Sequence, residues 1–149
     1  METDTVAGKK KVCVVCFANY CRSPVAEAIL NHLYSEKIEV ISAGISPFVG
    51  SNMDRRSSEY LLSKGIGLKI HTPKKINQTI VIQSDFIYAI DPSILMQLNK
   101  LFPSHTSKIK LLNYSTPRLI MRDPYKLGNE DYLNVMERIF KVCENLELA

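Results

Sequence analysis

Short apolar runs alternate with amphipathic segments along the chain. Residues 10–17, KKVCVVCF, contain a nearly unbroken apolar run rich in β-branched residues, which is typical of a strand buried on both faces. The pattern predicts that this strand ends near Cys16. Ser23 fits a helix N-cap and Pro24 the first helical position, and apolar residues then recur at helical spacing to about Tyr34. The first predicted unit is therefore a strand, a loop and a helix.

The same alternation continues toward the C-terminus. The remaining predicted elements are strands at 38–44, 85–91 and 108–112 and helices at 55–64, 92–101 and 131–146. The helix at 55–64 is expected to stop at Gly65. The last helix is amphipathic, with an apolar face formed by Leu133, Met136, Phe140 and Cys143. Alternating strands and helices predict an α/β fold: a single domain with a four-stranded parallel sheet and helices on both faces.

Composition describes an ordinary globular chain. It has 149 residues, 46% of them hydrophobic and 23% charged, which suits one domain spanning 1–149 with its own core. Residues 1–10 carry no apolar run long enough for a signal peptide, and we expect them to be a flexible extension. No segment approaches the roughly 18 apolar residues of a membrane span. We therefore expect a cytoplasmic protein without membrane partners.

Charge and cysteine content limit the partners and the cysteine chemistry that we expect of this chain. The net charge is +4, and its basic residues form small separate clusters that we interpret as solvated surface, so no nucleic-acid partner is expected. A mildly basic protein does attract anionic substrates. The four cysteines are expected to be thiols, because disulfides are rare in the reducing cytoplasm.

The segment between the first strand and the first helix holds the main candidate chemistry. It reads CFANYCR from Cys16 to Arg22 and lies where parallel α/β folds bind ligands, beyond the carboxyl end of a strand. Successive backbone N–H groups, a helix N-terminus and the Arg22 guanidinium could surround a phosphate-like oxyanion. The same electrostatic field stabilises a thiolate. Cys16 is therefore a candidate nucleophile near neutral pH.

This segment also resembles a known family. VCFANYCRSPVAEAIL, residues 15–30, is similar to the signature of the low-molecular-weight protein tyrosine phosphatases, in which a C-x5-R-S loop opens the chain and a DPY element lies late in it. SAGISP, His71, YAIDPS and DPYKLG at 123–128 follow in the family's order and approximate spacing. The resemblance spans nearly the whole chain. It implies a flavodoxin-like fold of the phosphotyrosine protein phosphatase I type, as one low-molecular-weight phosphatase domain.

The resemblance implies a set of catalytic residues. Cys16 would attack the phosphorus of a phosphomonoester, Arg22 would hold its equatorial oxygens, and Asp123 would be the general acid. Ser23 would hydrogen-bond the sulfur and ease its later departure. The contacts to phosphate and substrate would come from Phe17, Ala18, Asn19, Tyr20, Cys21, Ser23, Phe48 and Tyr125.

Partners and supporting residues are implied as well. Substrates would be phosphotyrosine proteins or small aryl phosphates, and phosphate or other oxyanion inhibitors would occupy the loop. No metal or organic cofactor is implied. Ser42 and His71, together with Asn19, match family positions that brace the loop from behind rather than act chemically.

Two positions depart from the family pattern. Ala18 replaces the usual glycine, and because a Cβ limits positive φ, we expect a slight shift of the loop and reduced turnover. Lys126 follows Tyr125 where the family often has a second tyrosine. The entrance to the expected active site would therefore have a lysine where the family often has an aromatic side chain.

Other functions fit the residues less well. Cys13 and Cys16 have the C-x-x-C spacing of redox pairs and zinc half-sites, but within a strand they face opposite ways, and no second ligand pair exists. A phosphate-binding module without catalysis would need neither Cys16 nor Asp123. Arsenate reductases of this fold need further cysteines, and only Cys143 follows the loop. Arginine phosphatases of this fold usually carry a small threonine in place of Tyr20.

The remaining cysteines have simpler interpretations. Cys13 and Cys143 are expected to be small hydrophobic residues packed in the core. Cys21 lies five residues after Cys16. The resemblance supports a redox role in which peroxide-oxidised Cys16 condenses with Cys21 to a disulfide. The alternative is that Cys21 is only a small residue that fits under the loop.

Overall fold

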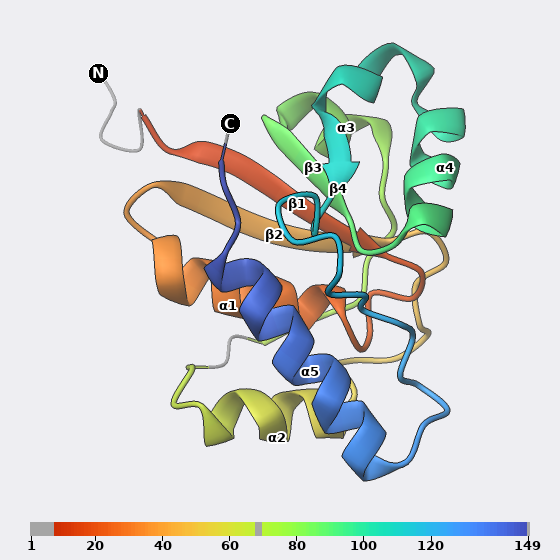
Figure 1. Cartoon of the computed structure of the whole chain (residues 1–149). Helices are drawn as coiled ribbons and strands as arrows, with labels where there is room; N and C mark the ends of the chain where they lie inside the picture. The colour runs from red at the N-terminus through yellow and green to blue at the C-terminus, as the bar shows by residue number, and fades with distance from the viewer. Residues whose placement is uncertain (1–7, 68–69, 149) are drawn as a thin grey trace.

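The computed structural model describes residues 8–67 and 70–148 and contains one four-stranded parallel sheet in the order β2-β1-β3-β4 (Figure 1). The strands are β1 (Lys10–Cys16), β2 (Ile38–Gly44), β3 (Phe86–Ala89) and β4 (Ile109–Leu111). The helices are α1 (Ser23–Tyr34), α2 (Arg55–Ser63), α3 (Gln78–Gln83), α4 (Pro92–Leu101) and α5 (Asn129–Glu144), with a 3-10 helix η1 (Pro103–Lys108). The predicted α/β fold is confirmed.

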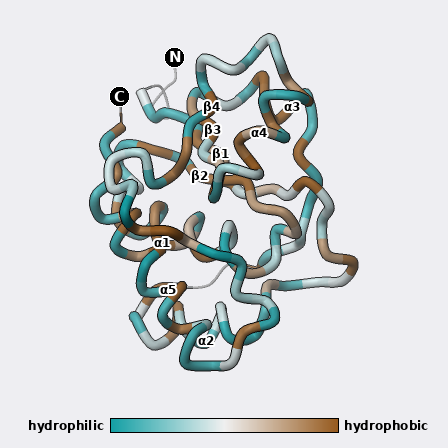
Figure 2. The backbone as a smooth tube through the Cα atoms, turned by 45° about the vertical axis from the view of Figure 1, so that its right-hand side comes forward, coloured by the Kyte–Doolittle hydropathy of each residue, from teal (hydrophilic) through white to brown (hydrophobic). Residues whose placement is uncertain are grey.

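Helices cover both faces of the sheet. α1 and α5 lie on one face with α2 packed against both, and α3 and α4 lie on the other (Figure 1). β1 has a strand on either side, and its residues from Val12 to Cys16 are all buried. Such continuous burial is expected of a central parallel strand with both faces covered. Apolar residues accordingly follow one another along β1, whereas α2 mixes polar and apolar positions (Figure 2).

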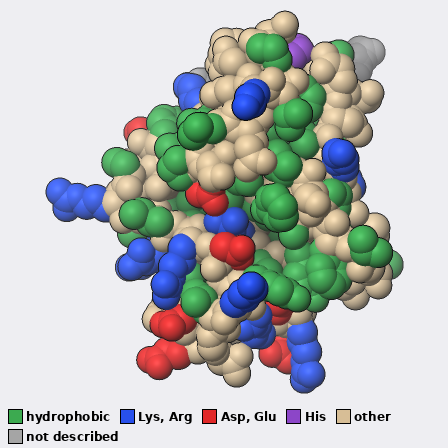
Figure 3. All heavy atoms as spheres, turned by 90° about the vertical axis from the view of Figure 1, so that its right-hand side faces the viewer, with side chains coloured by type: hydrophobic (Ala, Val, Ile, Leu, Met, Phe, Trp, Pro, Cys, Tyr) green, Lys and Arg blue, Asp and Glu red, His purple; other side chains and the backbone are tan. Residues whose placement is uncertain are grey.

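The carboxyl ends of the strands meet at one edge of the sheet. Cys16 pairs with Gly44 of β2, and Val15 pairs with Ala89 of β3. The loops after these three strands therefore emerge side by side, which is where such sheets bind ligands. This edge faces the viewer in Figure 3, where acidic and basic side chains meet in a hollow bordered by hydrophobic ones.

Helix boundaries differ from the prediction by one or two residues at the start of α1, at the end of α2 and at both ends of α5. Ser23, the predicted N-cap, is instead the first residue of α1, and Arg22 occupies the cap position without a side-chain capping bond. α5 begins at Asn129, and Leu133 is 47% exposed although it was expected on the buried face. α5 packs against α1 and α2, and its buried face keeps Met136 and Cys143 of the predicted one but is rotated away from Leu133. The buried residues of α5 are Tyr132, Val135, Met136, Ile139, Val142 and Cys143.

Two short helices carry no periodic signal and were not predicted. α3 contains the β-branched run Thr-Ile-Val-Ile, which does not favour a helix. It forms because the Asn77 side chain accepts a hydrogen bond from the backbone N–H of Ile80 and caps its first turn. η1 begins at Pro103 and contains no buried residue. Gly65, in contrast, has a φ of 72° and ends α2 in the left-handed conformation that was expected.

The boundary between the N-terminal extension and the first strand differs slightly from the prediction. β1 begins at Lys10, so this residue belongs to the sheet and not to the flexible extension expected at 1–10. Residues 1–7 of that expected extension lie outside the described residues. Within the described ranges, every helix is too short or too polar to cross a bilayer.

Candidate active site

The loop at 16–22 curls back on itself between β1 and α1. Asn19 has a φ of 52°, in the left-handed region that asparagine tolerates better than most residues. This turn directs the backbone N–H of Asn19 to the Cys16 sulfur, with the nitrogen 3.2 Å from Sγ. Ala18 does not have a positive φ. The left-handed position of the loop is Asn19, so Ala18 does not need a positive φ; reduced turnover from this substitution stays a prediction.

Cys16 is the last residue of β1, and its side chain lies beside Ser23, the first residue of α1. Its Sγ is 2.9 Å from the Ser23 hydroxyl oxygen, and the residue is 3% exposed. The helix N-terminus and the Asn19 N–H both place partial positive charge beside the sulfur. A thiolate at this position would accept hydrogen bonds from the Ser23 hydroxyl and the Asn19 N–H. Two hydrogen-bonding groups of the loop and of α1 therefore contact the sulfur directly.

Asn19 is the centre of a buried network behind the loop. Its Nδ2 donates to Ser23 Oγ at 2.8 Å and to Ser42 Oγ at 2.9 Å. The backbone carbonyl of Asn19 lies 2.8 Å from Nε2 of His71. Ser42 in turn donates to the Glu27 carboxylate at 2.5 Å. The structure thus brings together the three residues expected to brace the loop, and it adds Glu27, whose position in α1 gave no signal.

Arg22 is held from the opposite side. Its Nη1 donates to Oδ2 of Asp91 at 2.9 Å and to the backbone carbonyl of Met121 at 2.8 Å. Arg22 is only 4% exposed, so these bonds fix its guanidinium in one orientation. Asp91 also caps α4 by accepting from the N–H of Ile94. The YAIDPS segment contains Asp91, but its contact with Arg22 was not anticipated.

A cavity of about 300 Å³ opens above this loop. It is lined by Cys16, Phe17, Ala18, Tyr20, Cys21, Arg22, Phe48, Asp123 and Tyr125. The rings of Tyr20 and Phe48 are stacked with their centroids 4.0 Å apart, and the rings of Tyr20 and Tyr125 meet edge to face with their centroids 6.1 Å apart. These rings form an aromatic mouth around a polar floor. Nine of the thirteen expected site residues line this cavity, and two more, Asn19 and Ser23, contact the Cys16 sulfur. The other two, Ser42 and His71, lie behind the loop.

Asp123 enters the cavity from the segment before α5. Its Oδ1 accepts a hydrogen bond from the backbone N–H of Tyr125 at 3.1 Å. The residue is solvent-exposed, and its Oδ2 accepts no hydrogen bond from the described residues. One carboxylate oxygen is thus fixed by the loop, and the other is available to a ligand in the cavity.

A second, larger cavity of about 420 Å³ lies beside α1. Its lining includes Glu27, His32 and Glu39 but contains no cysteine and no arginine. It therefore lacks the thiol and the guanidinium that the smaller cavity combines, and the candidate chemistry belongs to the smaller cavity.

The other cysteines are less suited to nucleophilic chemistry. Burial raises the pKa of Cys13 to about 12 and that of Cys21 to about 12, and it also raises the pKa of Cys143. Cys13 and Cys143 are fully buried, as predicted for core residues. In residues 8–67 and 70–148, no cluster of three histidine, cysteine or acidic side chains is arranged to hold a metal ion.

Comparison with known proteins agrees with this geometry. The family model described as low molecular weight phosphotyrosine protein phosphatase matches residues 11–149. The mouse low molecular weight phosphotyrosine protein phosphatase is 32% identical over 148 residues, covering 92% of this chain and 93% of that protein.

Solved structures give the same result. Wzb of Vibrio vulnificus, in complex with benzylphosphonate, superposes with a TM-score of 0.85 at 25% identity, covering 92% of this chain and 96% of that one. VcLMWPTP-2, a low molecular weight phosphotyrosine phosphatase of Vibrio cholerae O395, has a TM-score of 0.84 at 29% identity over 91% and 93% of the two chains. With matches over nearly its whole length in sequence and in structure, this chain belongs to the low molecular weight phosphotyrosine protein phosphatase family.

Proposed function

We propose that this protein hydrolyses phosphotyrosine and other aryl phosphate monoesters through a phosphocysteine intermediate. The observation that carries the proposal is the convergence of Cys16, Arg22 and Asp123 on one cavity with an aromatic mouth. A nucleophile, a cation for the phosphoryl oxygens and a proton donor are the groups that this reaction needs.

In the first step, the Cys16 thiolate attacks phosphorus as the bond to the ester oxygen breaks. The Arg22 guanidinium and the loop N–H groups hold the equatorial oxygens, whose charge must be stabilised in the transition state. Asp123 gives its proton to the departing aryl oxygen, so the alcohol leaves neutral. The products of this step are the phenol, an S-phosphocysteine and the Asp123 carboxylate.

In the second step, water attacks the same phosphorus and the P–S bond breaks. The Asp123 carboxylate takes a proton from the water and regains its acid form. Cys16 leaves as a thiolate, stabilised by the Ser23 hydroxyl and the Asn19 N–H that contact its sulfur. Inorganic phosphate is released, and the enzyme returns to its starting state.

The mouth of the cavity favours an aryl phosphate. The side chains of Phe17, Phe48 and Tyr125 are partly exposed there and can contact both faces of a phenyl ring. A phosphoserine side chain has no aromatic ring with which to make these contacts. Tyr20, stacked on Phe48, narrows the entrance beside the loop and disfavours phosphoarginine. A cytoplasmic location and the absence of nucleic-acid partners remain predictions from the sequence.

The test is an assay of the purified protein on p-nitrophenyl phosphate and on a panel of phosphotyrosine, phosphoserine and phosphoarginine peptides. We expect hydrolysis of the aryl phosphate and of phosphotyrosine peptides, and acid-quenched samples should carry phosphate on the peptide containing Cys16. Binding of inorganic phosphate without hydrolysis of any substrate would instead identify a phosphate-binding module. Preference for phosphoarginine would overturn the substrate assignment alone.

A further inference from the structure

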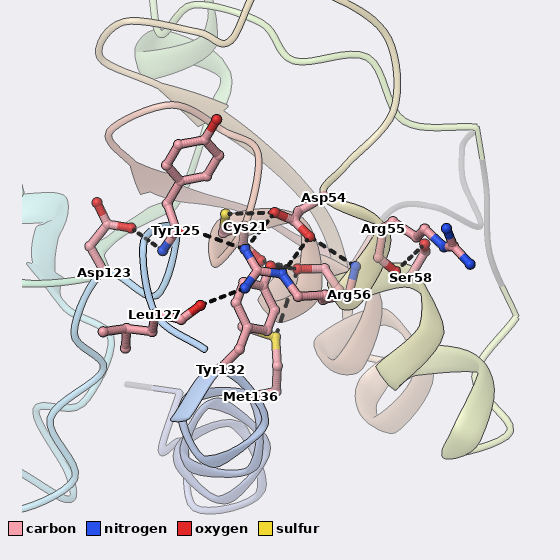
Figure 4. A network of polar contacts seen from close by, with 11 residues as sticks. Cys21, Asp54, Arg55, Arg56, Ser58, Asp123, Tyr125, Leu127, Tyr132 and Met136 are labelled. Carbon is pink, nitrogen blue, oxygen red and sulfur yellow. Dashed lines mark hydrogen bonds and ion pairs between the residues drawn. The ribbon is translucent and has the colours of Figure 1, made fainter. Parts of the chain in front are cut away.

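Two consecutive arginines open α2, and only the second points toward the active site. Figure 4 shows Arg56 directed at the segment that carries Asp123, whereas Arg55 points away from it. Arg56 Nη1 donates to the backbone carbonyl of Leu127 at 2.7 Å, and Nη2 donates to that of Tyr125 at 2.9 Å. One guanidinium therefore holds two carbonyls of the segment 123–128, here called the acid loop.

Arg56 is itself held on its other sides. Nε and Nη2 each lie 3.2 Å from a different oxygen of the Asp54 carboxylate, a fork-to-fork pair. The guanidinium carbon lies 3.9 Å from the centre of the Tyr132 ring. The side chain of Arg56 is 27% exposed, and that of Asp54 is 10% exposed. These contacts leave the guanidinium little freedom, so it can serve as a fixed point.

Asp54 joins this fixed point to the loop at 16–22. Its backbone N–H donates to the carbonyl of Tyr20 at 2.9 Å, and the Cys21 thiol lies 3.8 Å from its Oδ2. Ser57, on the same turn of α2, donates to the carbonyl of Cys21 at 2.9 Å. The start of α2 thus contacts the phosphate-binding loop and the acid loop at once.

The acid loop has few other restraints near its tip. Within it, the N–H of Tyr125 donates to Asp123 and the N–H of Leu127 donates to the carbonyl of Pro124. In the described part of the chain, Arg56 is the one residue outside the loop whose side chain donates hydrogen bonds to it. Upstream, Arg22 holds the carbonyl of Met121. The two ends of the segment that presents Asp123 are therefore held by two different arginines.

We propose that Arg56 is a positioning residue for the general acid: it bridges the phosphate-binding loop and the acid loop and so sets the place of the Asp123 carboxyl over Cys16. The inference rests on the proposed function, in which Asp123 protonates the leaving group. Arg56 touches no reacting atom, and its effect passes through the carbonyl of Tyr125 to the N–H of Tyr125 that orients Asp123.

A merely structural role of Arg56 predicts a different result. If Arg56 only joined α2 to α5 through Tyr132, its loss would destabilise the fold and lower activity equally for all substrates. If Arg56 positions Asp123, its loss should lower the rate only for substrates whose leaving group must be protonated. A phenol of high pKa leaves slowly unless it is protonated, whereas a phenol of low pKa leaves well as an anion. The dependence of rate on leaving-group pKa therefore separates the two roles.

The experiment measures kcat/KM for a series of aryl phosphates with wild type, Arg56→Gln, Arg56→Lys and Arg55→Gln. kcat/KM is the appropriate parameter because it covers the steps through departure of the phenol. Arg55→Gln is the matched control: it removes the same charge one residue away, from a side chain that is 87% exposed and pairs only with Glu59 among the described residues. We expect this control to match wild type.

Arg56→Gln should lower kcat/KM by about 10- to 100-fold for phenyl phosphate, because a displacement near 1 Å of a catalytic group costs up to this much. The loss should approach zero for the best leaving groups, and inhibition by inorganic phosphate should be unchanged. Arg56→Lys should lower kcat/KM almost as much as Arg56→Gln does, since an ammonium cannot bridge two carbonyls and a carboxylate as the guanidinium does. This variant decides the question if Arg56→Gln does not fold.

A double-mutant cycle supplies the second criterion. In an Asp123→Ala background, Arg56→Gln should have almost no further effect on kcat/KM, because the group that it positions is gone. An equal loss for all leaving groups, or an undiminished loss in the Asp123→Ala background, would overturn the positioning role and leave the proposed function intact. Failure of wild type to hydrolyse any aryl phosphate would overturn the proposed function, and this inference with it.

Discussion

Replacing Gly44 with alanine should both destabilise the fold and slow the enzyme, although Gly44 carries no functional group. Gly44 ends β2 and lies against the curled loop after β1. A Cβ at this position would lie 2.8 Å from the carbonyl oxygen of Phe17 and 2.9 Å from the backbone nitrogen of Asn19. Both neighbours are backbone atoms, so they cannot rotate away as the end of a side chain would.

The size of the effect follows from these distances. Ordinary contacts of a Cβ begin at 3.4 Å. The loop must therefore move by roughly half an ångström, and overpacking of this kind costs about 1–3 kcal/mol. For a chain of this length, each kcal/mol lowers the melting temperature by about 2–4 °C, which gives a decrease of about 2–12 °C.

The same movement affects catalysis through Asn19, whose N–H donates to the Cys16 sulfur at 3.2 Å. A hydrogen bond to a charged group contributes about 1.5–3 kcal/mol. Its loss from a thiolate nucleophile corresponds to a decrease in kcat/KM of about 10- to 150-fold. Activity should therefore fall even at temperatures where the variant is fully folded.

Thermal unfolding by circular dichroism and hydrolysis of p-nitrophenyl phosphate at 25 °C measure the two effects separately. Gly67→Ala is the control, because a Cβ there meets no described atom within 4 Å. It should change neither quantity appreciably. Wild-type stability and activity in Gly44→Ala would show that the loop tolerates the added methyl group, contrary to this prediction. A loss of stability without loss of activity would refute the link from Gly44 to the sulfur.

The remaining predictions concern the reacting groups. Cys16→Ser should abolish hydrolysis and retain binding of inorganic phosphate by calorimetry, because a hydroxyl stays protonated near neutral pH; near-wild-type turnover would exclude Cys16 as the nucleophile. Asp123→Ala should slow hydrolysis by about 10²- to 10⁴-fold, less for good leaving groups, in a stopped assay over several aryl phosphates. An equal loss across the series would contradict its role as the acid. Peroxide should inactivate the enzyme, and dithiothreitol should restore its activity, because the oxidised enzyme holds a Cys16–Cys21 disulfide that mass spectrometry can detect. Cys21→Ser should recover poorly after the same treatment. A link between Cys13 and Cys16 would contradict that assignment.

Elements with a local signal were predictable from the amino-acid sequence. β1 was recognisable because a central parallel strand is apolar along its length, and the end of α2 because Gly65 can adopt a positive φ. The loop from Cys16 to Arg22 was recognisable for a similar reason: its sulfur, amides and guanidinium are contiguous in the chain. The alternation of strands and helices then placed this loop at the carboxyl edge of the sheet.

Local signals were insufficient where the outcome depends on packing. A positive φ in the loop was expected at position 18, where the family has glycine, but the residue with a positive φ is Asn19. The Asn19 side chain is held by hydrogen bonds with two serines and a backbone N–H. The exposed side of α5 was misjudged at Leu133, because the face that a helix buries depends on which neighbour it meets. Neither fact can be derived from residues within one turn of the position.

The order of residues along the chain was therefore enough to identify the kind of site, a thiol and a guanidinium on a loop before a helix, and the order of the elements that carry it. Tertiary structure decided how the site is completed, because the contacts that complete it join residues far apart in the chain. Arg22 contacts Met121 across 99 residues, and Arg56 contacts Tyr125 across 69. Consecutive helical side chains point about 100° apart, so only the packing of α2 could select Arg56 rather than Arg55 to hold the acid loop.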